Sequence, residues 1–162
     1  MKPKDLFYHL TCLFFIIIIG AAVYEHLALW PSAFADLPRS LSVFQGNFKL
    51  DTSPFWIPIH PITFILFIIT LLLNRRTERR RFILVPLVVY ALILVITFSY
   101  FVPELLSLIN MAYSDTSDAV ATSRASRWEL LSVVRMFLLI ASAMILLNGL
   151  NKPADQTRLH TA

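Results

Sequence analysis

Four long apolar stretches restrict the fold of this chain more than any other feature. They cover residues 8–29, 56–73, 82–102 and 130–147, and a helix that rises about 1.5 Å per residue needs about 20 residues to cross the hydrocarbon layer. Within lipid the backbone must satisfy its own hydrogen bonds, which unbroken apolar stretches do as helices. The sequence therefore predicts an all-α protein, a four-helix transmembrane bundle.

The composition agrees with a membrane environment. Hydrophobic residues make up 57% of the 162 residues and charged residues 15%, against roughly 25% charged residues in soluble domains. A soluble core of this size cannot bury so much apolar surface, so we expect the lipid bilayer to surround the protein. We expect residues 1–162 to form a single integral membrane domain.

Five arginines within seven residues separate the second and third stretches and predict the orientation: Arg75, Arg76, Arg79, Arg80 and Arg81. Because positively charged loops stay in the cytoplasm, this loop and both termini should be cytoplasmic in a multi-pass protein of the cell (inner or plasma) membrane. The same rule accounts for most of the basic residues and the net charge of +4. We therefore expect no nucleic-acid partner.

The two loops on the opposite side, residues 30–55 and 103–127, are predicted to be structured. The pair Gly46-Asn47 between Phe44 and Phe48 fits the turn of a short hairpin. Further along, Asp118 or Ser117 can cap a helix that continues into the last span.

Ionisable residues within the apolar stretches gather near the outer end of the predicted spans: Glu25, His26, His60, Glu104 and Arg135. A charge buried in a bilayer costs about 2.5–3.5 kcal/mol on insertion scales, so such groups normally face the bundle and find partners. We expect these five side chains to meet in one chamber. Pro58 and Pro61, which suit the opening turn of a helix, should form a rigid corner that presents His60.

The residue types indicate possible roles in that chamber. His60 is the candidate proton acceptor, Glu25 or Glu104 would orient it, and Arg135 would stabilise negative charge on an oxygen. The expected lining residues of a pocket for a lipophilic small molecule are Tyr24, His26, Trp56, Tyr100 and Trp128.

A metal site is a further possibility that the sequence leaves open, and no cofactor is assigned. The candidate ligands are His26, His60, Glu25 and Glu104, which are suitable residue types. The Glu-x-x-His spacing of di-iron bundles is absent, because Glu25 and His26 are adjacent and point about 100° apart on a helix.

Two segments in the second half of the chain carry a family resemblance. Thr97-Phe98-Ser99-Tyr100-Phe101-Val102-Pro103 ends the third stretch, and Arg127-Trp128-Glu129 precedes Arg135 near the start of the fourth. This pattern, over about a third of the chain, resembles the anthrone-oxygenase-like family of small four-helix membrane proteins. In that family a tryptophan and an arginine seven residues apart open the last helix, and they map onto Trp128 and Arg135; Glu104 departs from the pattern. The resemblance implies a four-helix membrane fold, and some fungal members are linked to oxidation of polycyclic phenols.

The sequence leaves two hypotheses of different kinds. In the first, the protein is a membrane oxidoreductase that takes a lipophilic substrate from the outer leaflet. In the second, it is a non-catalytic membrane subunit or ligand-binding protein, whose polar cluster locks the bundle and whose outer loops dock a partner. This hypothesis includes assembly as an oligomer or with a partner subunit.

Overall fold

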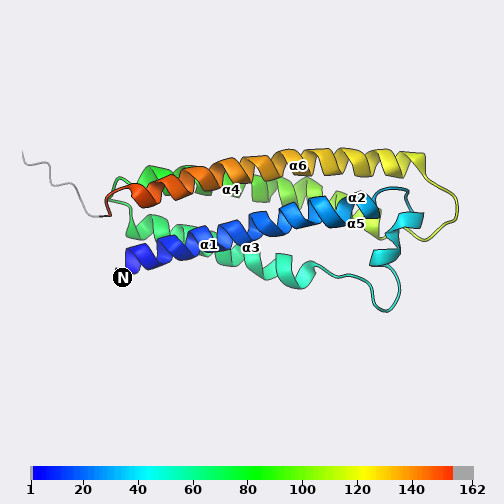
Figure 1. Ribbon diagram of the computed structural model, residues 1–162, viewed down its shortest axis with the longest axis horizontal. Coiled ribbons are helices and arrows are strands. Elements are labelled where there is room, and N and C mark those ends of the chain that lie inside the picture. Colours follow the sequence, from blue (N-terminus) through cyan, green and yellow to red (C-terminus); the bar gives the residue numbers. More distant parts are fainter. Residues whose placement is uncertain (1, 155–162) are drawn as a thin grey trace, which may run out of the picture.

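The computed structural model describes residues 2–154. All regular secondary structure in these residues is helical, and they contain no strand. Four long helical segments lie side by side along the molecule (Figure 1). Their elements are α1 Pro3–Tyr24, η1 Glu25–Leu29 and α2 Trp30–Ala33; α3 Ser53–Leu73; α4 Arg80–Ile96, η3 Thr97–Phe101 and α5 Val102–Ile109; and α6 Ala119–Asn148 with η4 Gly149–Asn151. A separate short helix, η2 Arg39–Phe44, lies in the first long connection.

All four segments are long and apolar enough to cross a membrane, which confirms the predicted all-α fold with four helices of membrane-crossing length. Their outward faces carry large apolar side chains, among them Leu13, Leu92 and Phe137, which are all more than half exposed. In a bilayer such faces contact lipid tails, whereas in water they would associate. The protein therefore has the architecture of a small multi-pass membrane protein.

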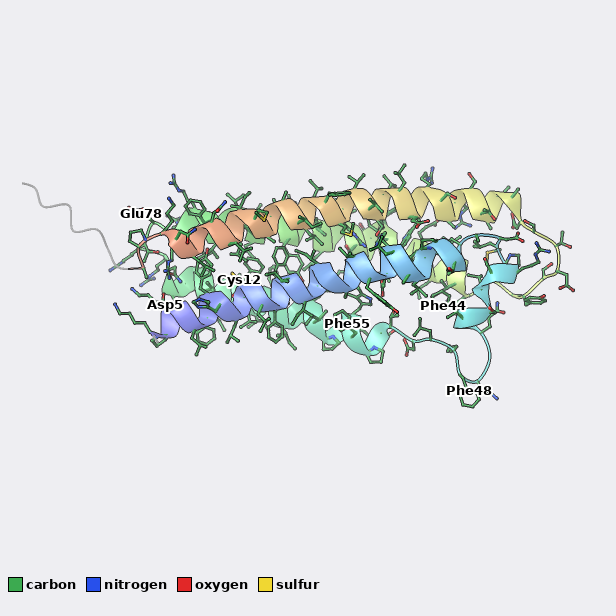
Figure 2. All side chains as sticks on the ribbon, in the orientation of Figure 1. Asp5, Cys12, Phe44, Phe48, Phe55 and Glu78 are labelled. Atoms are coloured by element: carbon green, nitrogen blue, oxygen red, sulfur yellow. The ribbon has the colours of Figure 1, made fainter. Side chains whose placement is uncertain are left out.

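The two ends of the bundle differ, and we name them by their contents. The arginine end contains the link 74–79 between α3 and α4 together with residues near both chain termini (Figure 1). The loop end contains the two long connections, residues 34–52 and 110–118. Side chains from both ends are drawn in Figure 2, where Asp5 and Glu78 mark the arginine end and Phe44 and Phe48 the loop end.

One of the five clustered arginines is buried, which the sequence did not indicate. Arg79 is 8% exposed, and its Nη1 donates to Asp5 Oδ1 at 2.6 Å while its Nε donates to the Lys152 carbonyl oxygen at 2.8 Å. Its guanidinium also lies over the Tyr8 ring, 5.5 Å from the centroid. Arg79 thus ties the N-terminal helix, the α3–α4 link and the end of the last helix together.

Aromatic residues fill the bundle between α1, α3 and α4. The Phe15 ring meets Phe67 edge-on with 5.2 Å between centroids and meets Tyr90 at 5.3 Å. All three side chains have no exposed surface. Edge-to-face pairs of this kind add to the packing that holds the helices in register.

The loop end is an ordered cap, as the sequence predicted. Asp118 is the N-cap of α6, and its carboxylate accepts from the backbone N–H groups of Val120 and Ala121, both at 2.9 Å. The Asp118 N–H donates to the Leu37 carbonyl oxygen at 2.8 Å, which joins the two connections. Trp30, Phe34, Leu37 and other apolar residues pack beneath them.

The predicted hairpin at Phe44–Phe48 is wrong. The chain there leaves η2, turns at Gly46 with a φ of 76°, and closes with a single hydrogen bond from the Leu50 N–H to the Val43 carbonyl oxygen. No strand flanks the turn within the described residues. A lone Gly-Asn turn without an alternating apolar pattern on both sides lacks the packed face that a hairpin needs. Phe48, at the tip of this loop, is fully exposed and points away from the bundle (Figure 2).

The prediction that Pro58 and Pro61 belong to an opening turn is also wrong. α3 begins at Ser53 with Pro54 in its first turn, so Pro58 and Pro61 lie inside the helix. Each removes one backbone N–H from the hydrogen-bond ladder, and both side chains are exposed on the outer surface of the bundle. His60 is therefore held by a proline-containing helix rather than by a corner.

Candidate functional site

Glu25 provides the first of three ionisable side chains that approach one another inside the bundle. It opens the π-helical segment η1, and its Oε1 accepts a hydrogen bond from Trp56 Nε1 of α3 at 2.8 Å. The Trp30 indole also lies beside this carboxylate, although its N–H does not reach hydrogen-bond geometry. Two indoles thus flank this half-buried carboxyl group.

Arg135 brings the opposite charge from α6. Its Nη1 donates to Thr97 Oγ1 at 3.0 Å and its Nη2 to Ser132 Oγ at 2.8 Å. The guanidinium lies over the Phe101 ring, 4.1 Å from its centroid, which is a close cation–π contact. It also attracts the Glu25 carboxylate electrostatically, without a direct ion pair.

His60 completes the group from α3. Its Nδ1 lies 2.8 Å from the Tyr90 hydroxyl of α4, and its ring stacks on Trp56 with 5.4 Å between centroids. The Arg135 guanidinium acts electrostatically on this ring too. We call Glu25, Trp56, His60, Tyr90 and Arg135 the polar centre.

The polar centre is bracketed by two π-helical segments. η1 begins at Glu25, and η3 begins at Thr97, which binds Arg135. A π-bulge inserts one residue into an α-helix and is often found at functional sites, because it turns side chains that a regular helix would point elsewhere. Here η1 starts at Glu25, a residue of the polar centre, and η3 starts at Thr97, which hydrogen-bonds the Arg135 side chain of the polar centre.

Three of the predicted site residues lie in an aromatic layer beside the polar centre. His26 stacks parallel to Trp128 with 6.4 Å between centroids, and its Nδ1–H donates to the Ala22 carbonyl oxygen at 2.7 Å. Trp128 Nε1 donates to the Phe101 carbonyl oxygen at 2.9 Å, and Tyr100 packs edge-on against Phe101 at 5.2 Å. Phe101, which carries Arg135 on its face, joins this layer to the polar centre.

Two predicted site residues do not join either group. Glu104 accepts two hydrogen bonds from Arg124, both at 2.9 Å, in a fork-like pair at the loop end. The third stretch continues as helix to Ile109, so Glu104 is carried outward beyond the layer in which it was expected. Tyr24 is 69% exposed and faces away from Glu25, because consecutive helical residues point about 100° apart.

The expected metal ligands are also separated. Among the described residues, no three His, Cys, Asp or Glu side chains form a group that could hold a metal ion. Glu104 is paired with Arg124, and His26 is stacked on Trp128. The set His26, His60, Glu25 and Glu104 therefore does not form a site in this fold.

Sequence reasoning missed four residues that build the site. Tyr90 positions His60, Thr97 and Ser132 bind Arg135, and Trp30 flanks Glu25. Tyr90 had a recognisable signal, because it is the one phenol hydroxyl deep in an aliphatic stretch, where it requires a partner. Ser132 also had one, because it lies three residues before Arg135 and so shares its helix face. Thr97 carried none, since hydroxyl side chains in lipid usually bond their own helix, as Thr97 also does at the Ile93 carbonyl oxygen.

The arrangement combines an imidazole, a carboxyl group and a guanidinium held by three partners in an apolar bundle. Such a group can accept a proton, stabilise an oxyanion or bind a polar head of a lipophilic molecule. No family model matches the chain, and it matches no curated protein and no solved structure in the comparisons made.

Proposed function

We propose that the protein is a small membrane enzyme that moves a proton on a lipophilic substrate at the polar centre. The observation that supports this most is that Glu25 of η1 and His60 of α3 both contact Trp56, with Arg135 of α6 within electrostatic range of both, in an otherwise apolar bundle. Each ionisable group costs free energy at such a place. Three groups of complementary chemistry at one point favour a chemical role.

His60 is the proton acceptor in this proposal. In one tautomer Nδ1–H donates to the Tyr90 hydroxyl oxygen, and the Tyr90 O–H donates to the His60 carbonyl oxygen at 3.5 Å. The ring nitrogen Nε2 then carries a lone pair and accepts the substrate proton. Trp56, which stacks on the His60 ring, fixes the plane of that ring. The negative charge of Glu25 stabilises both the imidazolium that forms at His60 and the guanidinium of Arg135.

Arg135 stabilises the negative charge that the substrate gains. Its side chain is held at three points, by Thr97, Ser132 and the Phe101 ring. A cation fixed in advance in a medium of low dielectric constant stabilises an oxyanion without reorganisation, which is worth about 3–4 kcal/mol for typical oxyanion donors. A substrate with an acidic C–H or O–H next to a carbonyl would gain most.

The family resemblance at Trp128 and Arg135 suggests aromatic ketones and phenols as substrates. For anthrone, loss of the ring CH₂ proton to His60 leaves an anion whose charge rests on the oxygen. Dioxygen then oxidises this carbanion form, and the net reaction converts anthrone and O₂ into anthraquinone and water. No additional oxidant or reductant is required for this balance.

The test uses purified protein in liposomes with anthrone as the probe. Oxygen consumption and anthraquinone formation are followed for the wild type, His60→Gln and Glu104→Gln. We expect His60→Gln to lower the rate by about 10²–10⁴-fold, the usual contribution of a general base, with little change in thermal stability. Glu104→Gln, which removes a carboxylate outside the polar centre, should retain the rate. Equal rates for His60→Gln and wild type would exclude the proposed base.

A non-catalytic subunit is the second candidate, and one observation favours it. The Arg135 guanidinium is already satisfied by partners within the chain, as expected of a group that only fixes helix packing. In that case Arg135→Ala should lower the thermal stability in detergent, and no variant of the polar centre should affect turnover of anthrone. The exposed Phe48 loop would then be the surface that docks a partner.

A further inference from the structure

Two cations meet at one aromatic ring at the arginine end of the bundle. The Arg81 guanidinium lies 5.0 Å from the centroid of the Phe82 ring, and the Lys152 ammonium nitrogen lies 5.6 Å from the same centroid. Arg81 stands in the first turn of α4, whereas Lys152 follows η4 at the end of the last helical segment. The fold therefore brings positive side chains from two separate segments to one point.

The packing of the last helical segment fixes the backbone on both sides of this point. The Lys152 carbonyl oxygen accepts a hydrogen bond from Nε of the buried Arg79 at 2.8 Å. Gly149 lies so close to α4 that a Cβ added there would be 2.6 Å from Phe82 Cβ. The backbones that carry Phe82 and Lys152 are thus packed together, and both cations are held beside the ring.

The positive charge at this point has no carboxylate partner within the described residues. Asp5 is bonded to Arg79, and no ion pair in residues 2–154 joins Glu78 to Arg81 or Lys152. Arg81 is exposed and Lys152 is half-exposed, so an anion can reach both. Because like charges repel each other, an anion that contacts the two cations together would be stabilised there.

An apolar strip on α4 continues from Arg81 toward the middle of the bundle. Val85, Val88 and Leu92 follow Arg81 at intervals of four, three and four residues, which places the four side chains on one face of the helix. All three apolar side chains are exposed. At about 1.5 Å per residue the strip is about 16 Å long, close to one leaflet of a hydrocarbon layer about 30 Å thick.

We propose that the arginine end binds an acidic phospholipid, whose phosphate group contacts Arg81 and Lys152 and whose acyl chains lie along Val85, Val88 and Leu92. Arginine and lysine bind phosphate through charge-assisted hydrogen bonds, and basic side chains at a membrane surface attract acidic lipids. The cations followed by the apolar strip match the two parts of such a lipid in order and in length. The polar centre contributes no residue to this site, which is therefore independent of the proposed function.

Native mass spectrometry of the full chain in detergent micelles measures lipid binding directly. The probes are phosphatidylglycerol, which is acidic, and phosphatidylcholine, which is zwitterionic, with the same acyl chains. We expect the wild type to bind phosphatidylglycerol about tenfold more tightly. An excess of inorganic phosphate should displace little of the bound lipid, because inorganic phosphate has no acyl chains to contact the strip.

Three variants make the test specific. Arg81→Gln/Lys152→Gln should weaken phosphatidylglycerol binding about 30-fold, which corresponds to about 1 kcal/mol for each basic side chain at a membrane surface. The matched control Arg75→Gln/Arg76→Gln removes the same charge at exposed positions of the same end and should retain most of the affinity. Arg81→Lys keeps both charges and should retain the preference for the acidic lipid, which separates loss of charge from loss of folding.

Each outcome supports or overturns the site. A loss of affinity confined to Arg81→Gln/Lys152→Gln would support it. Equal affinity of the wild type for the two lipids, or an equal loss in the Arg75→Gln/Arg76→Gln control, would mean that the arginine end attracts lipid only diffusely and would overturn it. Displacement of the lipid by inorganic phosphate would assign the two cations to a soluble anion and would also overturn it.

Discussion

Replacing Gly149 by alanine is the substitution whose outcome follows most directly from the packing. A Cβ at this position would lie 2.1 Å from the Tyr8 hydroxyl oxygen and 2.6 Å from Phe82 Cβ. The Tyr8 hydroxyl is fixed, because it donates to the Leu146 carbonyl oxygen at 2.7 Å and the side chain is fully buried. The new methyl group therefore requires either Tyr8 or the last helix to move.

The expected destabilisation combines three contributions. Forcing a methyl group into a filled site costs about 1–3 kcal/mol, and loss of the Tyr8 hydrogen bond costs about 1 kcal/mol. Alanine also restricts the unfolded chain more than glycine does, which stabilises the folded state by about 0.4–1 kcal/mol. We therefore expect Gly149→Ala to lower the free energy of unfolding by about 1–3.5 kcal/mol, the sum of these terms.

The assay is unfolding in detergent micelles, with Gly20→Ala as the matched control. A Cβ at Gly20 meets nothing within 4 Å, so this variant should gain about 0.5–1 kcal/mol as a helix interior does. Tyr8→Phe in the Gly149→Ala background removes the nearest atom and should recover part of the loss. If Gly149→Ala proves as stable as Gly20→Ala, the described packing of the last helix against α1 is wrong.

Further predictions concern the two ends of the bundle. A hydrogen bond from Ser117 holds the pKa of Asp36 below its ordinary value of 3.8. The stabilisation from this Ser117–Asp36 contact is therefore complete above pH 3.8 and is lost as the pH falls through the lower pKa of the folded state. Pepsin cleavage of residues 34–52 should rise over that pH range for the wild type, whereas Asp36→Asn should be cleaved independently of pH. Asp5→Asn leaves the buried Arg79 without its carboxylate partner. It should therefore lower the free energy of unfolding by about 1.5–3 kcal/mol, the usual value for a hydrogen bond to a charged group. The control Arg75→Ala, at an exposed position, should change the free energy of unfolding little. Reporter domains fused to either terminus should both locate to the cytoplasm, and a reporter active only outside the cytoplasm would contradict the orientation that the arginines predict.

Hydropathy was sufficient to predict the four spans, because a bilayer leaves an unbroken apolar stretch few alternatives to a helix. Because a charged group is costly in lipid, the sequence also indicated that Glu25, His60 and Arg135 would face the interior of the bundle. The position of Glu104 was not predictable, since it depends on where η3 alters the helical register and on how far α5 continues. The outward direction of Tyr24 follows from its place next to Glu25, because consecutive helical residues point about 100° apart. Nothing in the sequence signals a π-bulge.

The buried role of one arginine was equally hidden. Arg79 and its neighbours have the same charge and the same hydropathy, and only the packing of both chain ends around the α3–α4 link selects one of them. One partner of Arg135 was hidden for a related reason. Thr97 reaches it from the segment η3, and that relation is set by the packing of the helices rather than by spacing along the chain, whereas Ser132 lies three residues before Arg135 on the same helix.

The central claim is that the Glu25 carboxylate and the Arg135 guanidinium interact across the bundle, and a double-mutant cycle measures this directly. Glu25→Gln, Arg135→Gln and the double variant are compared with the wild type by unfolding in the same micelles. We expect each single variant to be destabilised and the double variant to be more stable than their sum, with a coupling of about 1–3 kcal/mol, as found for residues in one charged network. Strictly additive effects would mean that the two charges do not interact, and the polar centre as described would not exist.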